Sequence, residues 1–507
     1  LYYPPFEAAV EAGVGAVMCA YNRVNGSYAC GNSGILQRDL KEGMGFHGFV
    51  LSDWGATLAG FAMGGAAMVQ NGLDMEMPSG MLLSEKAQLF MARAPESQTQ
   101  VALDEAAVRV LTSIFRMRLD VDEGCVGPLG CFAALRSNQT SAGHSSVARE
   151  VATSAVTLLA NDGILPLRAA RVSTLAVVGR AASVSVDGTA KGEFTADYYS
   201  GGGSGHCQAW SLVTPLEGIV RRAAAAGVRV NASTSGVVAE AVEAARHADA
   251  VVVVAATTSS EAFDRSSLSL DDGADALIDA VAQVRPTIVL MQTPGAVLTP
   301  WRDRVSAIAN LFLAGQETGN AWAAILFGDA TPAGKLPVMF PLTRDDTVAP
   351  HGRQVPYSEG RATSYRSPTF KAAFPFGHGL SFTSFAYGRP QVDRSSCNAR
   401  ACLRLPISNT GKFPGREVVQ AYLEFPPEGA VPGRVLRGFR KTRLLQPGES
   451  EEVFFAFSAR DLSSYRADGG WTPWEHVHVY LGASSADLRQ DLLLSTSGAV
   501  PLPQSHA

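Results

Sequence analysis

The stretch A-V-V-V-V-A-A-T-T-S-S-E, from Ala250 to Glu261, decides much of the expected fold. Consecutive apolar residues are typical of a short strand that is buried on both faces, as inside a parallel sheet. Polar residues follow at once, so the strand ends in a loop at its carboxyl edge. Loops at this edge carry the functional residues of open α/β sheets. The loop places Glu261 ahead of Asp264 and Arg265, which we expect to form a structural ion pair.

Strands and helices alternate on both sides of this stretch. Apolar runs predict strands and Ala-rich runs predict helices: strands at 174–178, 250–255, 287–291 and 307–313, and helices at 216–226, 237–247 and 274–284. This alternation predicts a doubly wound, mostly parallel sheet in an α/β domain over residues 147–344.

Two further domains are expected. The first, residues 1–121, also alternates, with strands at 15–21 and 49–53 and helices at 5–12, 35–44, 58–70 and 101–118. It predicts a parallel sheet, either open or closed into a barrel, followed by a linker at 122–146. After a polar linker or loop at 345–385, β-type runs at 403–408, 417–425, 451–457 and 476–481 predict a small β-sandwich over 386–507.

The composition excludes several classes of protein. Among 507 residues, 42 Lys and Arg stand against 47 Asp and Glu, for a net charge of −5 without long runs of one sign, which argues against nucleic-acid binding. The longest apolar stretch is far shorter than the roughly eighteen residues of a membrane span. The chain begins Leu1-Tyr2-Tyr3 with neither an initiator Met nor a signal peptide, so we expect a further segment upstream.

The cysteines and sequons suggest secretion. Six of the seven cysteines form close pairs suited to short disulfide loops: Cys19 with Cys30, Cys125 with Cys131, and Cys397 with Cys402. Cys207 is left over as a free thiol. Sequons at Asn25, Asn138 and Asn231 fit a glycoprotein. The alternative is that the cysteines are small, buried apolar residues and that the sequons arose by chance.

Two carboxylates are candidates for catalysis. Asp53 ends the strand F-V-L-S-D-W, and the adjacent Trp54 offers a flat apolar face to a sugar ring. Taken alone, Asp53 could equally cap the helix that follows. Glu261 is the second candidate because it could be the partner of Asp53. Retaining glycoside hydrolysis needs two carboxyl groups about 5–5.5 Å apart.

Other chemistries find little support. The glycine-rich segment Y-S-G-G-G-S-G-H, 199–206, lacks the Lys and Ser or Thr of a phosphate-binding loop, so we expect a flexible loop beside a cleft rather than a nucleotide site. The nine His and seven Cys show no metal-binding spacing, and no G-x-S-x-G elbow is present. We therefore expect no cofactor and no metal.

Several motifs in order resemble glycoside hydrolase family 3, in its β-glucosidase branch. They are V-G-A-V-M-C-A-Y-N-R-V-N-G (14–26), G-F-V-L-S-D-W-G-A (48–56), T-T-S-S-E-A-F-D-R-S-S-L-S-L (257–270), G-Q-E-T-G-N-A (315–321), L-F-G-D-A-T-P-A-G-K-L-P (326–337), F-G-H-G-L-S-F-T-S-F (376–385), N-T-G-K-F-P-G-R-E-V-V-Q (409–420) and L-R-G-F-R-K-T (436–442). The resemblance implies the C-terminal part of a (β/α)8 TIM barrel, an α/β sandwich and a fibronectin type III-like β-sandwich.

The resemblance also implies roles for individual residues. Asp53 matches the nucleophile and Glu261 the general acid/base. Tyr21 matches a tyrosine beside the nucleophile, Trp54 an aromatic lining the sugar site, and Ser204 a loop residue that contacts substrate. Trp54 favours a glucoside, because the β-xylosidase branch usually has Cys at this position.

We therefore expect a secreted, retaining, exo-acting β-glucosidase that releases terminal non-reducing glucose from β-glucosides or cello-oligosaccharides. A β-xyloside is the runner-up substrate; an N-acetylglucosaminidase would need a His-Asp acid/base arrangement that is not visible. Only about three strand–helix units precede the second domain, so we expect an N-terminally truncated member of the β-glucosidase branch. The alternative is that the chain is a catalytically inactive fragment or a carbohydrate-binding remnant. We expect no nucleic-acid or membrane partner, and a homodimer stays open.

Overall fold

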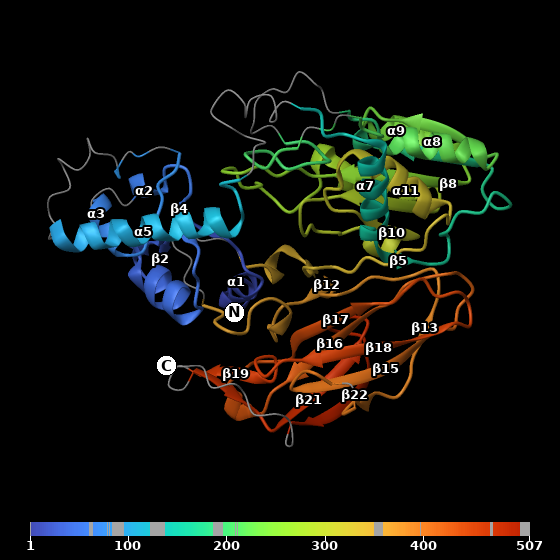
Figure 1. Ribbon diagram of the computed structural model, residues 1–507. Helices are drawn as coiled ribbons and strands as arrows, with labels where there is room; N and C mark the ends of the chain where they lie inside the picture. The colour runs from blue at the N-terminus through green and yellow to red at the C-terminus, as the bar shows by residue number, and fades with distance from the viewer. Residues whose placement is uncertain are drawn as a thin grey trace. The chain divides into compact units, whose positions relative to one another are not determined.

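The computed structural model describes residues 2–59, 64–78, 80, 82–83, 96–121, 137–185, 196–207, 209, 211–348, 358–395, 397–466 and 470–496. The chain divides into two compact units, Leu1–Gln139 and Thr140–Ala507, each with its own core. Figure 1 colours the first unit blue to cyan and the second cyan through red. Of the helices in the described ranges, none is both long enough and apolar enough to cross a lipid bilayer.

The first unit contains a parallel strand pair surrounded by helices. Its elements are α1 (Tyr3–Glu11), β1 (Ala16–Cys19), β2 (Arg23–Val24), β3 (Ser27–Tyr28), η1 (Ala29–Gly31), η2 (Gly34–Gly43), β4 (Phe49–Ser52), α2 (Ala56–Ala59), α3 (Gly65–Gln70) and α5 (Glu96–Arg116). β1 pairs with β4 in parallel, and Leu51 bridges Met75 in the same sense. The long helix α5 lies against α3 and β4 (Figure 1). This confirms the expected parallel α/β pattern.

One expected helix of this unit is interrupted. The apolar spacing over 58–70 predicted a single helix, but the structure has α2 and α3 as separate helices. Gly64, immediately before α3, has φ +79°, which is incompatible with a continuous right-handed helix. α2 begins at Ala56, directly after the segment that carries Asp53.

The second unit begins with an α/β domain. Its helices are α7 (Ala142–Ala155), η5 (Arg180–Ala182), α8 (Pro215–Ala225), α9 (Val238–Arg246), η6 (Asp271–Gly273), α10 (Ala274–Ala282), η7 (Arg302–Arg304), η8 (Gly315–Glu317) and α11 (Thr318–Leu326). Its sheet strands are β5 (Thr157–Asn161), β6 (Thr174–Val178), β7 (Arg229–Ser233), β8 (Ala250–Ala256), β9 (Thr287–Gln292) and β10 (Ala307–Asn310). The strand order is β5-β10-β9-β8-β6-β7, parallel except for β5 at one edge. The predicted doubly wound, mostly parallel sheet is confirmed.

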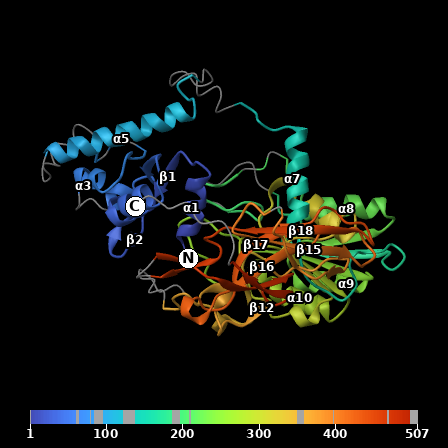
Figure 2. The ribbon, with the colours of Figure 1, turned by 60° about the horizontal axis from the view of Figure 1, so that its bottom comes forward.

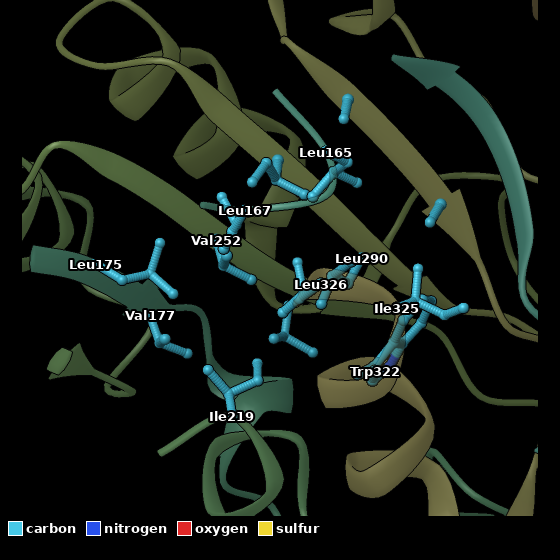
Figure 3. Close-up of a cluster of buried hydrophobic side chains, with 14 of the residues drawn as sticks. Leu165, Leu167, Leu175, Val177, Ile219, Val252, Leu290, Trp322, Ile325 and Leu326 are labelled. Carbon is cyan, nitrogen blue, oxygen red and sulfur yellow. The ribbon is translucent and has the colours of Figure 1, made fainter. Parts of the chain in front are cut away.

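The apolar strands explain why helices cover both faces of this sheet. In β8, Val252 and Val254 face α7, α8 and α11, whereas Val251 and Val253 face α9 and α10. Figure 3 shows the first of these two layers, where Ile219 and Trp322 meet the strands. Burial on both faces is the physical reason that β8 is apolar throughout. The strand therefore ends at an edge where polar residues can begin, which positions the Glu261 loop.

The α/β domain leads into a β-sandwich within the same unit. The short strand β11 (Phe340–Pro341), just before the expected linker, pairs with β12 (Ala372–Phe374) inside it. The helical turns η9 (Arg344–Asp346) and η10 (Ser364–Arg366) lie between these two strands. The strands that follow are β13 (Phe385–Tyr387), β14 (Gln391–Val392), β15 (Ala401–Asn409), β16 (Val418–Glu424), β17 (Val435–Lys441), β18 (Ser450–Phe457), β19 (Ser463–Arg466), β20 (Gly470–Pro473), β21 (His476–Gly482) and β22 (Leu488–Ser495), with η11 (Pro427–Gly429) between β16 and β17. All pair antiparallel, as the predicted sandwich requires.

The sandwich is held to the α/β domain by polar contacts. The Gln420 side-chain amide donates to the Gly377 carbonyl at 3.0 Å, and Lys335 forms an ion pair with Glu417 at 3.2 Å. The His378 ring nitrogen Nε2 lies 2.8 Å from the Leu159 carbonyl oxygen of β5. Figure 2 shows the sandwich strands (orange to red) beside the α/β domain (green).

Two of the three expected cysteine pairs lie in the described residues, and both are disulfides: Cys19–Cys30 and Cys397–Cys402. Cys207 is a free, exposed thiol. The expected pair Cys125 and Cys131 lies outside the described residues.

Candidate functional site

Asp53 lies at the carboxyl end of β4, where a parallel strand exposes its last residues. Its backbone N–H donates to the Cys19 carbonyl of β1 at 3.0 Å, which continues the strand pairing up to the carboxylate. The Trp54 backbone N–H donates to Oδ1 at 2.7 Å, and the Tyr21 hydroxyl lies 3.0 Å from the same oxygen. Among the described residues, nothing donates to Oδ2. One carboxylate oxygen is thus fixed by donors, and the other is left available.

Tyr21 and Trp54 surround this carboxylate. The Tyr21 hydroxyl is also 2.8 Å from the Trp54 carbonyl, so it links the segment after β1 to the segment after β4. The Cys19–Cys30 disulfide anchors the chain two residues before Tyr21. Trp54 is 66% exposed and Tyr21 48%. Exposed aromatic faces beside a carboxylate provide a surface on which a sugar ring can stack.

The alternative that Asp53 caps the following helix does not match the structure. The Asp53 side chain accepts from Trp54, whereas α2 begins only at Ala56. A capping side chain would accept from a backbone N–H inside the first turn.

A buried ion pair supports β4 from behind. Lys41 Nζ lies 2.8 Å from Asp74 Oδ1, and the Val50 N–H donates to Asp74 Oδ2 at 2.7 Å; both charged side chains are less than a twentieth exposed. Burial lowers the pKa of Lys41 and raises that of Asp74. Neither Lys41 nor Asp74 was predicted from the sequence as a functional or structural site. The alternation of acidic and apolar residues in L-D-M-E-M (73–77) was the available signal.

Removing one partner of this pair is expected to destabilise the protein strongly. In Lys41→Met the Asp74 carboxylate stays buried without its cation, so the free energy of unfolding should fall by about 3–5 kcal/mol. Chemical denaturation would measure it, with Arg38→Met as the control, because Arg38 pairs with Asp39 at the surface and its loss should cost at most about 1 kcal/mol. Equal effects of the two variants would contradict the prediction.

Glu261 lies on the loop after β8 and contacts the glycine-rich loop. Its backbone N–H donates to the Gly202 carbonyl, and the Gly202 N–H donates to the Ser259 carbonyl, both at 3.0 Å. The Ser204 N–H and hydroxyl each donate to Glu261 Oε2 at 2.7 Å. The two loops therefore pair like short strands and present the Glu261 side chain at an exposed position. Among the described residues, nothing donates to Oε1.

This contact requires glycine at position 203. Gly203 has φ +104°, and a Cβ there would lie 2.3 Å from Glu261 Cβ. Any side chain would therefore clash with the carboxylate and strain the backbone. The glycine-rich segment thus serves the close approach of Ser204 to Glu261.

The hydrogen bonds from Ser204 shift the pKa of the Glu261 carboxyl. Because both Ser204 donors favour the ionised form, they hold the pKa of the Glu261 carboxyl below its usual range. No charged side chain among the described residues contributes to this shift.

The expected ion pair between Asp264 and Arg265 is wrong. The Arg265 guanidinium turns to the protein and donates to the Ala296 carbonyl at 3.0 Å, and among the described residues Asp264 is not its partner. A partly buried guanidinium finds a fixed carbonyl acceptor, while the exposed Asp264 stays in water. Phe263, which the sequence analysis did not single out, is 66% exposed two residues after Glu261.

The described residues hold no group of three or more His, Cys, Asp or Glu side chains arranged to bind a metal ion. Asp53 and Glu261 belong to different compact units, and the short separation that retaining hydrolysis needs stays a prediction.

Three family patterns match the chain in order. Residues 1–113 match the glycosyl hydrolase family 3 N terminal domain, 156–382 the glycosyl hydrolase family 3 C-terminal domain, and 417–485 a fibronectin type III-like domain. A "Probable beta-glucosidase L" of Aspergillus terreus is 32% identical over 97% of this chain and 72% of its own length. The chain belongs to glycosyl hydrolase family 3. It is therefore a glycoside hydrolase by family.

Solved structures of this family resemble the whole chain. The β-glucosidase D2-BGL from Chaetomella raphigera has a TM-score of 0.88 at 30% identity and covers 98% of this chain and 75% of its own. DesR, a β-glucosidase from Streptomyces venezuelae solved with D-glucose, has a TM-score of 0.83 at 27% identity, over 97% and 77%. Family membership agrees with the domain order and the carboxylate-bearing loops described above.

Proposed function

We propose that this family 3 glycoside hydrolase is a retaining, exo-acting β-glucosidase that cleaves terminal β-D-glucosyl residues by double displacement. The observation that carries the proposal is the Asp53 carboxylate, fixed at Oδ1 by Tyr21 and Trp54 at the end of a parallel strand. The names of similar proteins, which include β-glucosidases from fungi and bacteria, support the substrate class.

In the first step, Asp53 Oδ2 attacks the anomeric carbon while the glycosidic carbon–oxygen bond breaks. The two contacts on Oδ1 orient the carboxylate, so that Oδ2 enters the reaction as the nucleophile. Glu261 gives its proton from Oε1 to the departing oxygen. The product of this step is a glucosyl ester on Asp53.

In the second step, Glu261 acts as a base. Water attacks the anomeric carbon, its proton passes to Glu261, and the bond to Asp53 breaks to release glucose with the original configuration. The Ser204 hydrogen bonds favour the ionised form of Glu261 and therefore assist this step more than the first.

The exposed aromatic residues support a glucoside as substrate. Trp54 and Tyr21 flank the carboxylate, and Phe263 lies near the acid/base on its own loop. A nitrophenyl β-D-glucoside should thus turn over faster than the corresponding xyloside, which lacks the hydroxymethyl group.

The decisive experiment traps the covalent intermediate. A dinitrophenyl β-glucoside with fluorine in place of the 2-hydroxyl forms the ester but hydrolyses slowly, so the protein should gain one fluoroglucosyl group. Peptide mass spectrometry should place it on the fragment that contains Asp53. A label elsewhere, or no label alongside turnover of the ordinary glucoside, would refute the proposed mechanism.

Ser204→Ala is expected to move the alkaline limb of the pH profile of kcat/KM to higher pH. Losing the hydroxyl donor raises the pKa of Glu261 toward its usual value, so the protonated acid persists to higher pH. Ser204→Thr keeps the hydroxyl and is the control. An unmoved limb in Ser204→Ala, with Glu261 still essential, would contradict the argument.

We also propose that the protein is secreted and glycosylated. Asn25, at the turn between β2 and β3, and Asn138 are exposed, whereas Asn231 lies half-buried in β7. Glycopeptide mass spectrometry on protein from a secreting eukaryotic host should find glycans at Asn25 and Asn138 and less occupancy at Asn231. Unmodified Asn25 and Asn138 would argue against this.

A further inference from the structure

The Glu261 loop and the glycine-rich loop meet at the reversal point of the α/β sheet. β6 and β8 are neighbours, and the chain continues from β6 outward to β7 but from β8 in the other direction to β9. At such a point the loops after the two strands diverge. Contacts with a third segment are therefore needed to keep the two loops close enough for Ser204 to reach Glu261.

Asp271, in η6, holds the start of the Glu261 loop. Thr257, buried directly after β8, donates its hydroxyl to Asp271 Oδ1 at 3.0 Å, and the Thr258 N–H donates to Oδ2 at 3.2 Å. Both carboxylate oxygens are used within the first two residues of the loop.

Asp272, the next residue, holds the segment that leads into the glycine-rich loop. The Tyr198 hydroxyl donates to Oδ2 at 3.0 Å, and Arg180, after β6, donates to Oδ1 at 3.3 Å. Burial and the Asp272 carboxylate raise the pKa of Tyr198 well above its usual value, so the hydroxyl keeps its proton. Asp272 has φ +55°, and its side chain contacts a different segment from that of Asp271.

We propose that Asp271 and Asp272 are positioning residues for the acid/base: adjacent carboxylates that fasten the two loops to one point and so set the contact of Ser204 with Glu261. The identity of Glu261 as acid/base rests on the proposed function. The positioning itself is a property of the fold that can be measured without turnover.

The test uses three variants: Tyr198→Phe, Asp272→Asn and the double variant that combines these two changes. The control is Asp264→Asn, which changes an exposed carboxylate on the Glu261 loop. Tyr198→Phe removes one hydroxyl and keeps the partly buried ring, and Asp272→Asn keeps an acceptor, so both proteins should fold. The primary measurement is amide hydrogen exchange of peptides covering residues 197–207 and 257–265. These peptides contain the N–H groups of Gly202, Ser204 and Glu261 that join the loops.

We expect exchange in both peptides to become roughly 10-fold faster in each single variant, because a hydrogen bond to a charged group is lost. The double variant should add little to Asp272→Asn, since both changes weaken the Tyr198–Asp272 hydrogen bond and only Asp272→Asn also weakens the ion pair with Arg180. Faster exchange in the 197–207 peptide alone, or in neither, would overturn the proposal.

Kinetic measurements then distinguish the positioning proposal from the proposed β-glucosidase function. In an active enzyme, Tyr198→Phe should move the alkaline limb of the pH profile of kcat/KM to higher pH, as expected for Ser204→Ala. In a protein that already carries Ser204→Ala, adding Tyr198→Phe should not move this limb further. A purely structural role would lower activity without moving the limb, which would overturn the link to the acid/base. If exchange responds but the wild-type chain shows no hydrolysis, the proposed function fails while the positioning stands.

Discussion

Asp53→Asn is expected to lower kcat/KM for a nitrophenyl β-D-glucoside by on the order of 10⁴-fold or more, because an amide cannot form the glucosyl ester. The substitution is nearly isosteric. Its amide oxygen can still accept from the Trp54 N–H and the Tyr21 hydroxyl, so the segment after β4 should keep its structure. Steady-state kinetics on purified protein measure the effect, with Asp264→Asn as the matched exposed control.

External azide distinguishes loss of the nucleophile from misfolding. In Asp53→Ala the space left by the carboxylate admits azide, which attacks the anomeric carbon directly and gives the α-glucosyl azide as the substrate loses its phenolate. Detection of this inverted product would identify Asp53 as the missing nucleophile. If Asp53→Asn retained activity within tenfold of wild type, the assignment would be wrong.

Glu261→Gln is expected to lower kcat/KM for a nitrophenyl glucoside by roughly 10²–10⁴-fold, the usual contribution of a positioned general acid. The loss should depend on the leaving group. A dinitrophenolate departs without a proton, so the first step should survive on that substrate, and slow release of the ester should appear as a burst of dinitrophenolate.

Azide also tests the acid/base. In Glu261→Ala it can attack the glucosyl ester on Asp53 from the face that water uses, which gives the β-glucosyl azide. The opposite configurations expected from the Asp53 and Glu261 variants assign the two carboxylates separately. If Glu261→Gln lowered kcat/KM equally on the nitrophenyl and dinitrophenyl glucosides and showed no burst, the role of Glu261 would be structural only.

Much of the α/β domain could be predicted from the sequence because its central strands β6, β8 and β9 are apolar over nearly their whole length and fully buried. β6, β8 and β9 start where their runs start, since burial on both faces leaves no polar position inside them. The polar, partly exposed edge strand β7 (R-V-N-A-S) was not predicted, and neither was the antiparallel edge strand β5. Its sequence T-L-L-A-N is too short to distinguish an edge strand from a helix end, and only its pairing with β10 defines it.

The ion pairs, in contrast, could not be predicted from the sequence. Lys41 and Asp74 are separated by 33 positions and pair only because η2 and the segment after α3 pack on β4. Asp264 and Arg265 are adjacent and were expected to pair, yet Arg265 has a carbonyl 31 positions away as its acceptor. Proximity in sequence says little about ion pairing when a folded neighbour offers a fixed acceptor.

The sequence by itself determined the domain order, the apolar strands and the two loops that carry Asp53 and Glu261, because hydrophobic periodicity and strand ends are local properties. Only the tertiary structure decided which donors reach those carboxylates. Tyr21 on Asp53, Ser204 on Glu261, and the Asp271–Asp272 pair beneath the two loops are contacts between segments distant in the chain. They form because the sheet brings strand ends together, and a hydrogen bond depends on distances of about 3 Å that no spacing in the sequence specifies.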